Sequence, residues 1–239
     1  MSEDTIYSKQ QNVVDFVFDE NVANVFSDMI RRSVPGYESI ITMLGVFAEK
    51  YVQSNSNIYD LGCSLGATTL SMRSRLSNKN CQMIAVDNSE AMVEKCQINI
   101  DATSGPDVQV ICDDIRNVDI KSASLAVLNF TLQFLPVDDR DKLLSKVADN
   151  MLPGGAIVLS EKITFENEKE CELNKELHLA FKKANGYSEL EIAQKRSAIE
   201  NVLIPETLDT HLHRLKKAGF SQAEIWFQCF NFVSIVAIK

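Results

Sequence analysis

A short loop of small residues at positions 60–66 is the segment of this sequence best suited to binding a ligand. Asp60 ends an apolar run, and Gly62 and Gly66 let the backbone approach a bound molecule closely. The helix expected next would begin with unpaired backbone N–H groups, which favour anionic ligands. A dinucleotide fingerprint has a further glycine where this chain has Ser64, and glycine-rich turns also occur for structural reasons. The loop therefore indicates a nucleotide-like ligand only together with other residues.

A carboxylate ends the next apolar run. Asp87 lies 21 residues after Gly66, close to the spacing at which an acidic residue reaches the ribose hydroxyls in nucleotide-binding α/β folds. The alternative is that Asp87 caps the following helix, although Ser89 could provide that cap. We interpret Asp87 as a ribose-binding residue.

Polar residues also follow the third and fourth apolar runs. Asp114 could accept a hydrogen bond from an exocyclic amine and Ile115 could cover a ring face, which suits adenine; an exposed acidic turn explains them equally well. Asn129 ends the next run, at the edge where open α/β sheets bind ligands, and Phe130 and Phe134 after it suit a core or a pocket wall. Four successive loops thus carry residues suited to a nucleotide, in the right order.

The elements that must position these loops alternate along the chain. Apolar runs at 57–61, 82–87, 107–111, 123–129 and 156–161 predict strands, and amphipathic stretches at 66–77, 89–102 and 138–151 predict helices, the last ending at Pro153-Gly154-Gly155. A helix at 206–218 precedes two abutting strands, 223–229 and 231–238. This pattern predicts one Rossmann-like α/β domain over 1–239, with helices on both faces of a seven-stranded, mostly parallel sheet that has one antiparallel edge strand.

Two regions fall outside this alternation. Residues 20–52 are expected to form an N-terminal helical cover, and 166–201 a highly charged helical insertion. The insertion should divide at Gly186, with Ser188 as the cap of its second helix. Such additions cover an active site or form a dimer contact.

Composition limits the classes of function. The chain has 239 residues and a net charge of −9, which argues against direct binding to the tRNA backbone and favours small-molecule chemistry. Six scattered cysteines without a CxxC pair indicate neither disulfides nor a metal site, and the pair His211 and His213 suits a solvated helix. No apolar run is long enough for a membrane helix and the start lacks a signal pattern, so we expect a cytoplasmic protein without a membrane anchor.

Several motifs together resemble the class I S-adenosylmethionine-dependent methyltransferase superfamily, over about residues 57–239 at fold level. They are 60–63 with Gly66, 86–88, 113–116, 129–135 and 153–155. The resemblance implies that the ligand is S-adenosylmethionine, with Asn129 near its sulfonium or amino acid part.

Further blocks resemble the bacterial carboxy-S-adenosyl-L-methionine synthase family more closely. They run through nearly the whole chain, at 32–37, 59–66, 129–134, 159–162, 184–192, 194–197 and 226–232. Ser64, irregular for methyltransferases in general, is typical of this family. The resemblance implies a homodimer whose ligand contacts are Tyr37, Gly62, Cys63, Ser64, Asp87, Asn88, Asp114, Ile115, Asn129 and Arg196.

The same resemblance implies an unusual reaction, in which S-adenosylmethionine is a substrate rather than a methyl donor. It receives a carboxyl group from prephenate, leaving phenylpyruvate, and a separate enzyme uses the product to modify the wobble uridine of tRNA (5-oxyacetyluridine). Arg196 would recognise the product carboxylate, for which its bidentate guanidinium is suited. The alternatives are a solvated helix charge for Arg196, and for the chain a conventional methyltransferase acting on a small molecule or tRNA, or a non-catalytic binding subunit.

Overall fold

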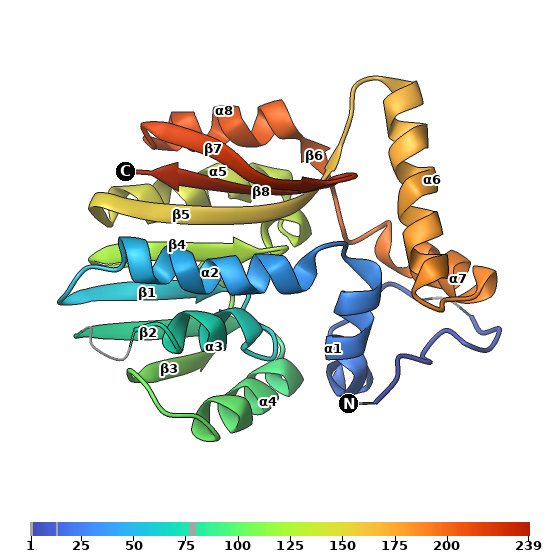
Figure 1. Cartoon of the computed structure of the whole chain (residues 1–239), viewed down its shortest axis with the longest axis horizontal. Coiled ribbons are helices and arrows are strands. Elements are labelled where there is room, and N and C mark those ends of the chain that lie inside the picture. Colours follow the sequence, from blue (N-terminus) through green and yellow to red (C-terminus); the bar gives the residue numbers. More distant parts are fainter. Residues whose placement is uncertain (1, 13, 77–79) are drawn as a thin grey trace.

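The computed structural model describes residues 2–12, 14–76 and 80–239 and is built around one twisted sheet (Figure 1). Its main path runs in the order β3-β2-β1-β4-β5-β8-β7, and β6 pairs with β5. Strands β1 to β5 are parallel along this path, whereas β8 is antiparallel to both of its neighbours. The strands are β1 Ser56–Leu61, β2 Cys81–Asp87, β3 Val108–Cys112, β4 Ala123–Asn129, β5 Met151–Thr164, β6 Glu206–Thr207, β7 Gln222–Cys229 and β8 Phe232–Ile238.

The mostly parallel α/β sheet is confirmed, but its antiparallel strand does not form the edge. Strand β8 lies one position inside it, and β7 is the edge strand. The cause is apolar content: β8 is buried along nearly its whole length, whereas β7 alternates between exposed and half-buried residues. A largely apolar strand gains most from a position between two other strands, and a more polar strand tolerates the open edge of the sheet. The two-residue β6 accounts for the additional strand.

Helices cover both faces of the sheet (Figure 1). One core lies beneath α2 (Tyr37–Tyr51) and α3 (Ala67–Arg73), with α4 (Glu90–Asp101) on the same side. The other lies beneath α5 (Val137–Asp149) and α8 (Leu208–Ala218). Successive residues of β4 enter these two cores alternately, as expected for a central strand buried on both faces. The helix predicted at 66–77 is α3, and its predicted end at residue 77 lies outside the described residues.

The prediction that Pro153-Gly154-Gly155 ends a helix is wrong. Helix α5 ends at Asp149, and the three residues lie within β5. Gly154 has a φ of +74° and its N–H donates to the carbonyl oxygen of Lys239, 3.2 Å away. The left-handed glycine therefore bends the start of a strand against the chain end instead of capping a helix.

Both accessory regions are helical, as predicted. The N-terminal one holds α1 (Glu20–Ser33) and α2, and the insertion holds α6 (Glu168–Ala184) and α7 (Glu189–Ile199). Ser188 caps α7 in a reciprocal capping box with Glu191. Helices α1, α6 and α7 gather at the carboxyl ends of the parallel strands (Figure 1). They are therefore positioned to enclose the loops that the sequence singles out.

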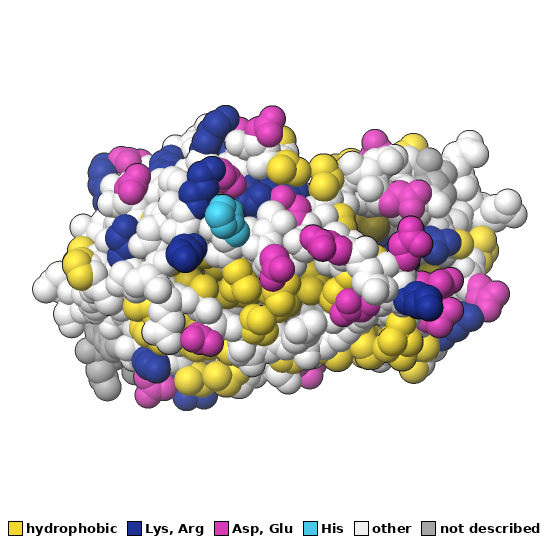
Figure 2. Space-filling view, turned by 90° about the horizontal axis from the view of Figure 1, so that it is seen from above, with side chains coloured by type: hydrophobic (Ala, Val, Ile, Leu, Met, Phe, Trp, Pro, Cys, Tyr) yellow, Lys and Arg dark blue, Asp and Glu magenta, His cyan; other side chains and the backbone are white. Residues whose placement is uncertain are grey.

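The surface on the β7 side of the sheet mixes acidic and basic side chains, with hydrophobic ones in a band across it (Figure 2). Ile225 of β7 contributes to the exposed apolar surface, with 42% of its area accessible. Within the described residues, no helix combines the length and the apolar character needed to cross a membrane.

A fully buried arginine ties the loop after β4 to the segment that follows α7. Arg140 of α5 donates to the carbonyl oxygens of Gln133, Leu135 and Ile204, at 2.9–3.1 Å, and its Nη1 lies 2.5 Å from Oε2 of Glu206. Five hydrogen bonds from the three guanidinium nitrogens thus hold chain segments more than 60 residues apart.

We expect Arg140→Met to lower the free energy of unfolding by about 3 kcal/mol or more, because buried carbonyl groups lose their donors and Glu206 loses one of its cations. Urea denaturation would measure the change. Arg75→Met is the matched control, since its ion pair with Glu49 is about half exposed on both sides and should contribute less than about 1 kcal/mol. Equal losses in the two variants would contradict the assignment of Arg140 as a structural tie.

Candidate functional site

A cavity of about 550 Å³ opens at the carboxyl ends of the parallel strands. This size is within the range of pockets that hold small-molecule ligands. Its walls combine the loops after β1, β2, β3 and β4 with side chains of α1, α6 and α7. Nine of the ten predicted contact residues line it: Tyr37, Gly62, Cys63, Ser64, Asp87, Asn88, Asp114, Ile115 and Asn129.

The glycine loop is held by the neighbouring strand. The N–H groups of Gly62 and Cys63 both donate to the carbonyl oxygen of Val86, at 2.8 and 2.9 Å. Gly62 has a φ of +92°, and a Cβ there would lie 2.2 Å from Oγ1 of Thr131. No other residue fits this path without displacing the loop after β4. The requirement for glycine is thus set by the close approach of two ligand-facing loops.

Asp87 is fixed by two backbone groups. Its Oδ2 accepts from the N–H of Ser64 at 2.8 Å and its Oδ1 from the N–H of Ser89 at 3.0 Å. Ser89, rather than Asp87, caps α4, because its Oγ accepts from the N–H of Met92. Burial raises the pKa of Asp87. The capping alternative for Asp87 is therefore wrong, and each carboxylate oxygen keeps a lone pair for a ligand.

Asp114 and Ile115 form the adjacent wall. Arg116 holds the pKa of Asp114 below its usual range through hydrogen bonds to both carboxylate oxygens. The side chain of Ile115 is buried beside it. Adenine recognition by this pair remains a prediction, in which the ionised Asp114 accepts from an amine while Ile115 covers a ring face.

Two buried oxygen atoms at the ends of β1 and β4 lack hydrogen-bond partners within the described part of the chain. They are Oδ1 of Asp60 and Oδ1 of Asn129. The other oxygen of Asp60 accepts from Oγ1 of Thr69 at 2.5 Å, and Nδ2 of Asn129 contacts Oγ1 of Thr68. Burial raises the pKa of Asp60 to about 7. Buried acceptors without partners are costly, so the oxygen of Asn129, which lines the cavity, suits a ligand that carries an N–H or ammonium donor.

These features fit S-adenosylmethionine. The cavity is large enough, acidic side chains line it at the ends of β2 and β3, and Asn129 lines it at the end of β4. Gly62 leaves room for close backbone approach. Asp60, which belongs to the motif pattern but not to the predicted set of ligand residues, is buried behind the described lining of the cavity.

Cationic residues line the opposite part of the cavity and were not predicted. Lys162 of β5, Lys182 of α6 and Lys195 of α7 all face it, with Arg31 of α1. Burial lowers the pKa of Lys182 to about 7 and that of Lys195 to about 8. Lys162 and Lys195 fall in the family blocks 159–162 and 194–197 without an assigned role, and Lys182 falls in none, so the packing of α6 and α7 is what brings the three to one cavity.

His178 of α6 also lines the cavity. Its Nε2 lies 2.8 Å from the carbonyl oxygen of Ser33, and its ring meets that of Phe232 edge-on at 4.9 Å. Burial lowers its pKa to about 3. The imidazole is therefore neutral near pH 7 and donates through Nε2, because a carbonyl oxygen can only accept.

The predicted role of Arg196 stays a prediction, and the interpretation of the histidine pair differs from the structure. Arg196 is exposed on α7 and is absent from the lining of the cavity within its own chain. The solvated-helix interpretation is wrong for His211, which is 1% exposed and whose ring nitrogens find no hydrogen-bond partner among the described residues, although His213 is exposed. Burial lowers the pKa of His211 to about 4. No group of three His, Cys, Asp or Glu side chains able to hold a metal occurs among residues 2–12, 14–76 and 80–239.

Comparison with known proteins gives full-length relatives. Residues 58–155 match the family model of a methyltransferase domain. A protein of Shewanella baltica strain OS155 named carboxy-S-adenosyl-L-methionine synthase is 58% identical over 241 residues, covering 100% of this chain and 99% of the relative. A protein of the same name from Shewanella putrefaciens is 59% identical over 240 residues, with the same coverage.

Solved structures with the same fold are more distant. Human N-acetylserotonin methyltransferase in complex with SAM matches with a TM-score of 0.61 and 17% identity, covering 92% of this chain and 55% of that one. A putative S-adenosyl-L-methionine-dependent methyltransferase from Methanococcus maripaludis matches with a TM-score of 0.59 and 20% identity, covering 97% of each chain. At these identities the likeness shows the fold alone.

We expect Gly62→Ala to weaken S-adenosylmethionine binding at least tenfold, because the added methyl group displaces the loops after β1 and β4. Isothermal titration calorimetry would measure it. Gly154→Ala is the matched control, since Gly154 also has a positive φ but nothing lies within 4 Å of a Cβ there. Comparable binding losses in both variants would show that backbone strain, not the close approach at Thr131, determines the effect.

Proposed function

Because the chain belongs to the family of carboxy-S-adenosyl-L-methionine synthases, we propose that it converts S-adenosyl-L-methionine and prephenate into carboxy-S-adenosyl-L-methionine and phenylpyruvate. The observation that carries this proposal is the 58% identity over the full length, which includes both accessory regions. The cavity supports it, because nine of the predicted contacts surround one space large enough for the nucleoside.

The reaction balances with water as a third product. The sulfonium makes the S-methyl protons acidic, prephenate loses a carboxyl group as carbon dioxide and its ring hydroxyl as hydroxide, and its ring becomes aromatic. The hydroxide takes a methyl proton to form water, and the resulting methyl carbanion bonds to carbon dioxide. Both fragments must stay in the pocket, so water exclusion is essential to this chemistry.

Different residues of the cavity bind different parts of S-adenosylmethionine. Asp87 holds the ribose, Asp114 and Ile115 hold the adenine, and the free oxygen of Asn129 accepts from the amino acid part. The methyl group of the sulfonium would then point into the part of the cavity that is lined by aromatic side chains.

The aromatic lining keeps that part of the cavity dry. Phe18 meets Phe134 edge-on at 5.3 Å, and Phe130 meets Phe232 at 6.0 Å. The N-terminal segment closes over the insertion, since the N–H of Phe16 donates to the carbonyl oxygen of Ala198 at 2.9 Å. These contacts support a cover that excludes solvent during the reaction.

The setting of the reaction is part of the same proposal. The chain acts as a single cytoplasmic domain in a homodimer, and a separate enzyme uses its product to modify the wobble uridine of tRNA. The net charge of −9 supports a protein that does not itself bind tRNA.

Arg196 recognises the carboxylate of the product from a neighbouring copy. Its exposed position on α7, outside the cavity lining of its own chain, supports an action across the dimer interface. A guanidinium binds a carboxylate through two parallel hydrogen bonds, which suits the added carboxyl group.

Incubation of the protein with S-adenosylmethionine and prephenate should yield a nucleoside heavier by one carboxyl group in place of one hydrogen, together with phenylpyruvate. Mass spectrometry of the nucleosides and ultraviolet absorbance of phenylpyruvate measure both products. Omission of prephenate is the control. A nucleoside that gains no carboxyl group, or S-adenosylhomocysteine formed in stoichiometry with a methylated acceptor, would contradict the proposal and favour a conventional methyltransferase.

We expect Arg196→Ala to weaken binding of the carboxylated product about tenfold or more, with little change in binding of S-adenosylmethionine, because only the product carries the additional carboxylate. Calorimetry with each ligand measures the difference, and Arg196→Lys should restore part of it. Equal losses for both ligands would indicate a structural role.

A mixture of inactive variants distinguishes the two possible subunits. Arg196→Ala chains combined with Asp87→Asn chains should regain activity if Arg196 acts across the interface, because one site of each mixed dimer is then intact. No regained activity in verified mixed dimers would place Arg196 in its own subunit's site.

A further inference from the structure

We infer that the part of the cavity lined by Lys162, Lys182 and Lys195 is the subsite for the carboxyl donor, and that it binds the carboxylate that the donor retains after the reaction. This inference rests on the proposed function, because it assigns a place to a donor with two carboxylates. The observation that supports it is that three cationic side chains line one cavity, although they come from β5, α6 and α7.

The three ammonium groups are close enough to affect one another. After burial, the main causes that lower the pKa of Lys182 are the charges of Lys195 and Lys162. The same three lysines add to the effect of burial on His178. A cluster of like charges with reduced access to water is unfavourable unless an anion joins it.

Counter-charges from the protein are incomplete. Lys195 pairs with Oδ2 of Asp4 at 3.3 Å and contacts Oγ of Ser33 at 3.1 Å. In the described portion of the chain, neither Lys162 nor Lys182 has a carboxylate within 4 Å. Two of the three charges thus remain available to an anionic ligand, whereas Lys195 is already held in place.

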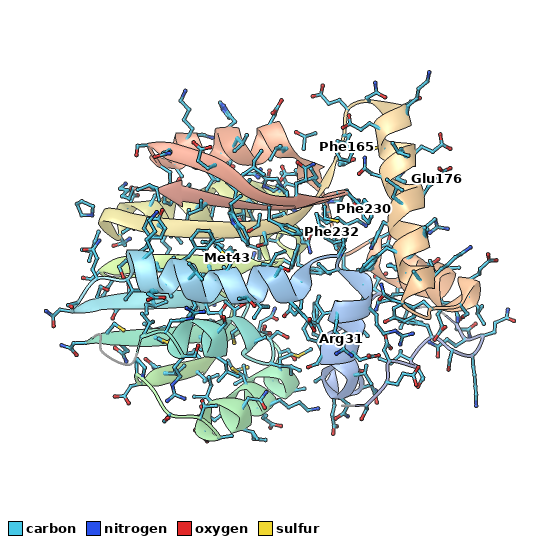
Figure 3. All side chains as sticks on the ribbon, viewed as in Figure 1. Arg31, Met43, Phe165, Glu176, Phe230 and Phe232 are labelled. Atoms are coloured by element: carbon cyan, nitrogen blue, oxygen red, sulfur yellow. The ribbon has the colours of Figure 1, made fainter. Side chains whose placement is uncertain are left out.

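The cluster lies next to the expected position of the S-methyl group. Lys162 pairs across the sheet with Phe232, whose ring contacts both Phe130 and His178. Phe130 directly follows Asn129, and Figure 3 shows Phe232 between the sheet and α6. The aromatic rings of Phe130 and Phe232 therefore form a wall between the amino acid end of the nucleoside site and the lysines.

This arrangement suits one of the two carboxylates better than the other. A carboxylate that leaves as carbon dioxide loses its charge in the transition state, so strong ion pairs to it would stabilise the ground state and slow the reaction. The pyruvyl carboxylate keeps its charge throughout and can anchor the donor on Lys162 and Lys182. The departing carboxylate then faces the aromatic wall, where a less polar environment favours loss of charge.

The test measures donor binding without turnover. S-adenosylhomocysteine lacks the methyl group, so prephenate can be titrated by calorimetry into protein saturated with it. We expect the double variant Lys162→Met/Lys182→Met to weaken prephenate binding more than tenfold, because two charge-assisted contacts are lost, and to leave the affinity for S-adenosylhomocysteine within about twofold. Lys169→Met, an exposed change on α6 outside the cavity, is the matched control and should bind prephenate as the unaltered protein does.

Each remaining outcome decides the matter. Unchanged prephenate affinity in the double variant, or an equal loss of S-adenosylhomocysteine affinity, overturns the subsite. If the double variant does not fold, Lys162→Gln and Lys182→Gln tested singly must each weaken prephenate binding, and failure of both to do so overturns it. If the protein forms the carboxylated product but the lysine variants bind prephenate normally, the subsite is rejected and the function is not. If the lysine variants lose prephenate binding but the protein forms no carboxylated product, only the function is rejected.

Discussion

The carbonyl oxygen of Val86 accepts hydrogen bonds from two consecutive N–H groups, those of Gly62 and Cys63, and the architecture of the site depends on this contact. It turns the chain at the end of β1 toward β2 and brings the N–H of Ser64 to the carboxylate of Asp87. The first two ligand loops are thereby joined into one rigid unit. The close approach of Thr131 to Gly62 adds the loop after β4 to that unit.

The part of the site that can be predicted from the sequence is the part built from strand ends. Parallel strands deliver their carboxyl ends to one edge, so residues such as Asp87 and Asn129 can be assigned to a common cavity from order and spacing alone. Local signals work equally well elsewhere: the turn at Gly186 and the cap at Ser188 depend only on nearby backbone geometry. Such predictions succeed because their causes lie within a few residues.

Predictions fail where the deciding contact is distant in the sequence. The bend of β5 at Gly154 is shaped by Lys239, and His211 is buried by the packing of α8 against α5, which no local pattern reveals. The positions of the lysines in the cavity also depend on contacts between residues that are distant in the sequence. The ammonium group of Lys195 is held at the cavity by its contact with Asp4, 191 residues away. Helix α6 is held beside the cavity by the hydrogen bond between His178 and the carbonyl oxygen of Ser33. Motifs assign roles in the nucleoside half of the cavity, whereas the lysines acquire a common role only through tertiary packing.

The two halves have opposite charge, and this division explains how a methyltransferase fold can accommodate a different reaction. The acidic loops after β2 and β3 suit a cationic sulfonium nucleoside, but the lysines of the accessory helices would repel it if they were left without an anion. A donor with negative charge removes that repulsion, so each ligand should favour the binding of the other. The core fold thus supplies the nucleoside site and Lys162, and the added helices supply the cover and the remaining charge that holds a second, anionic substrate beside the methyl group.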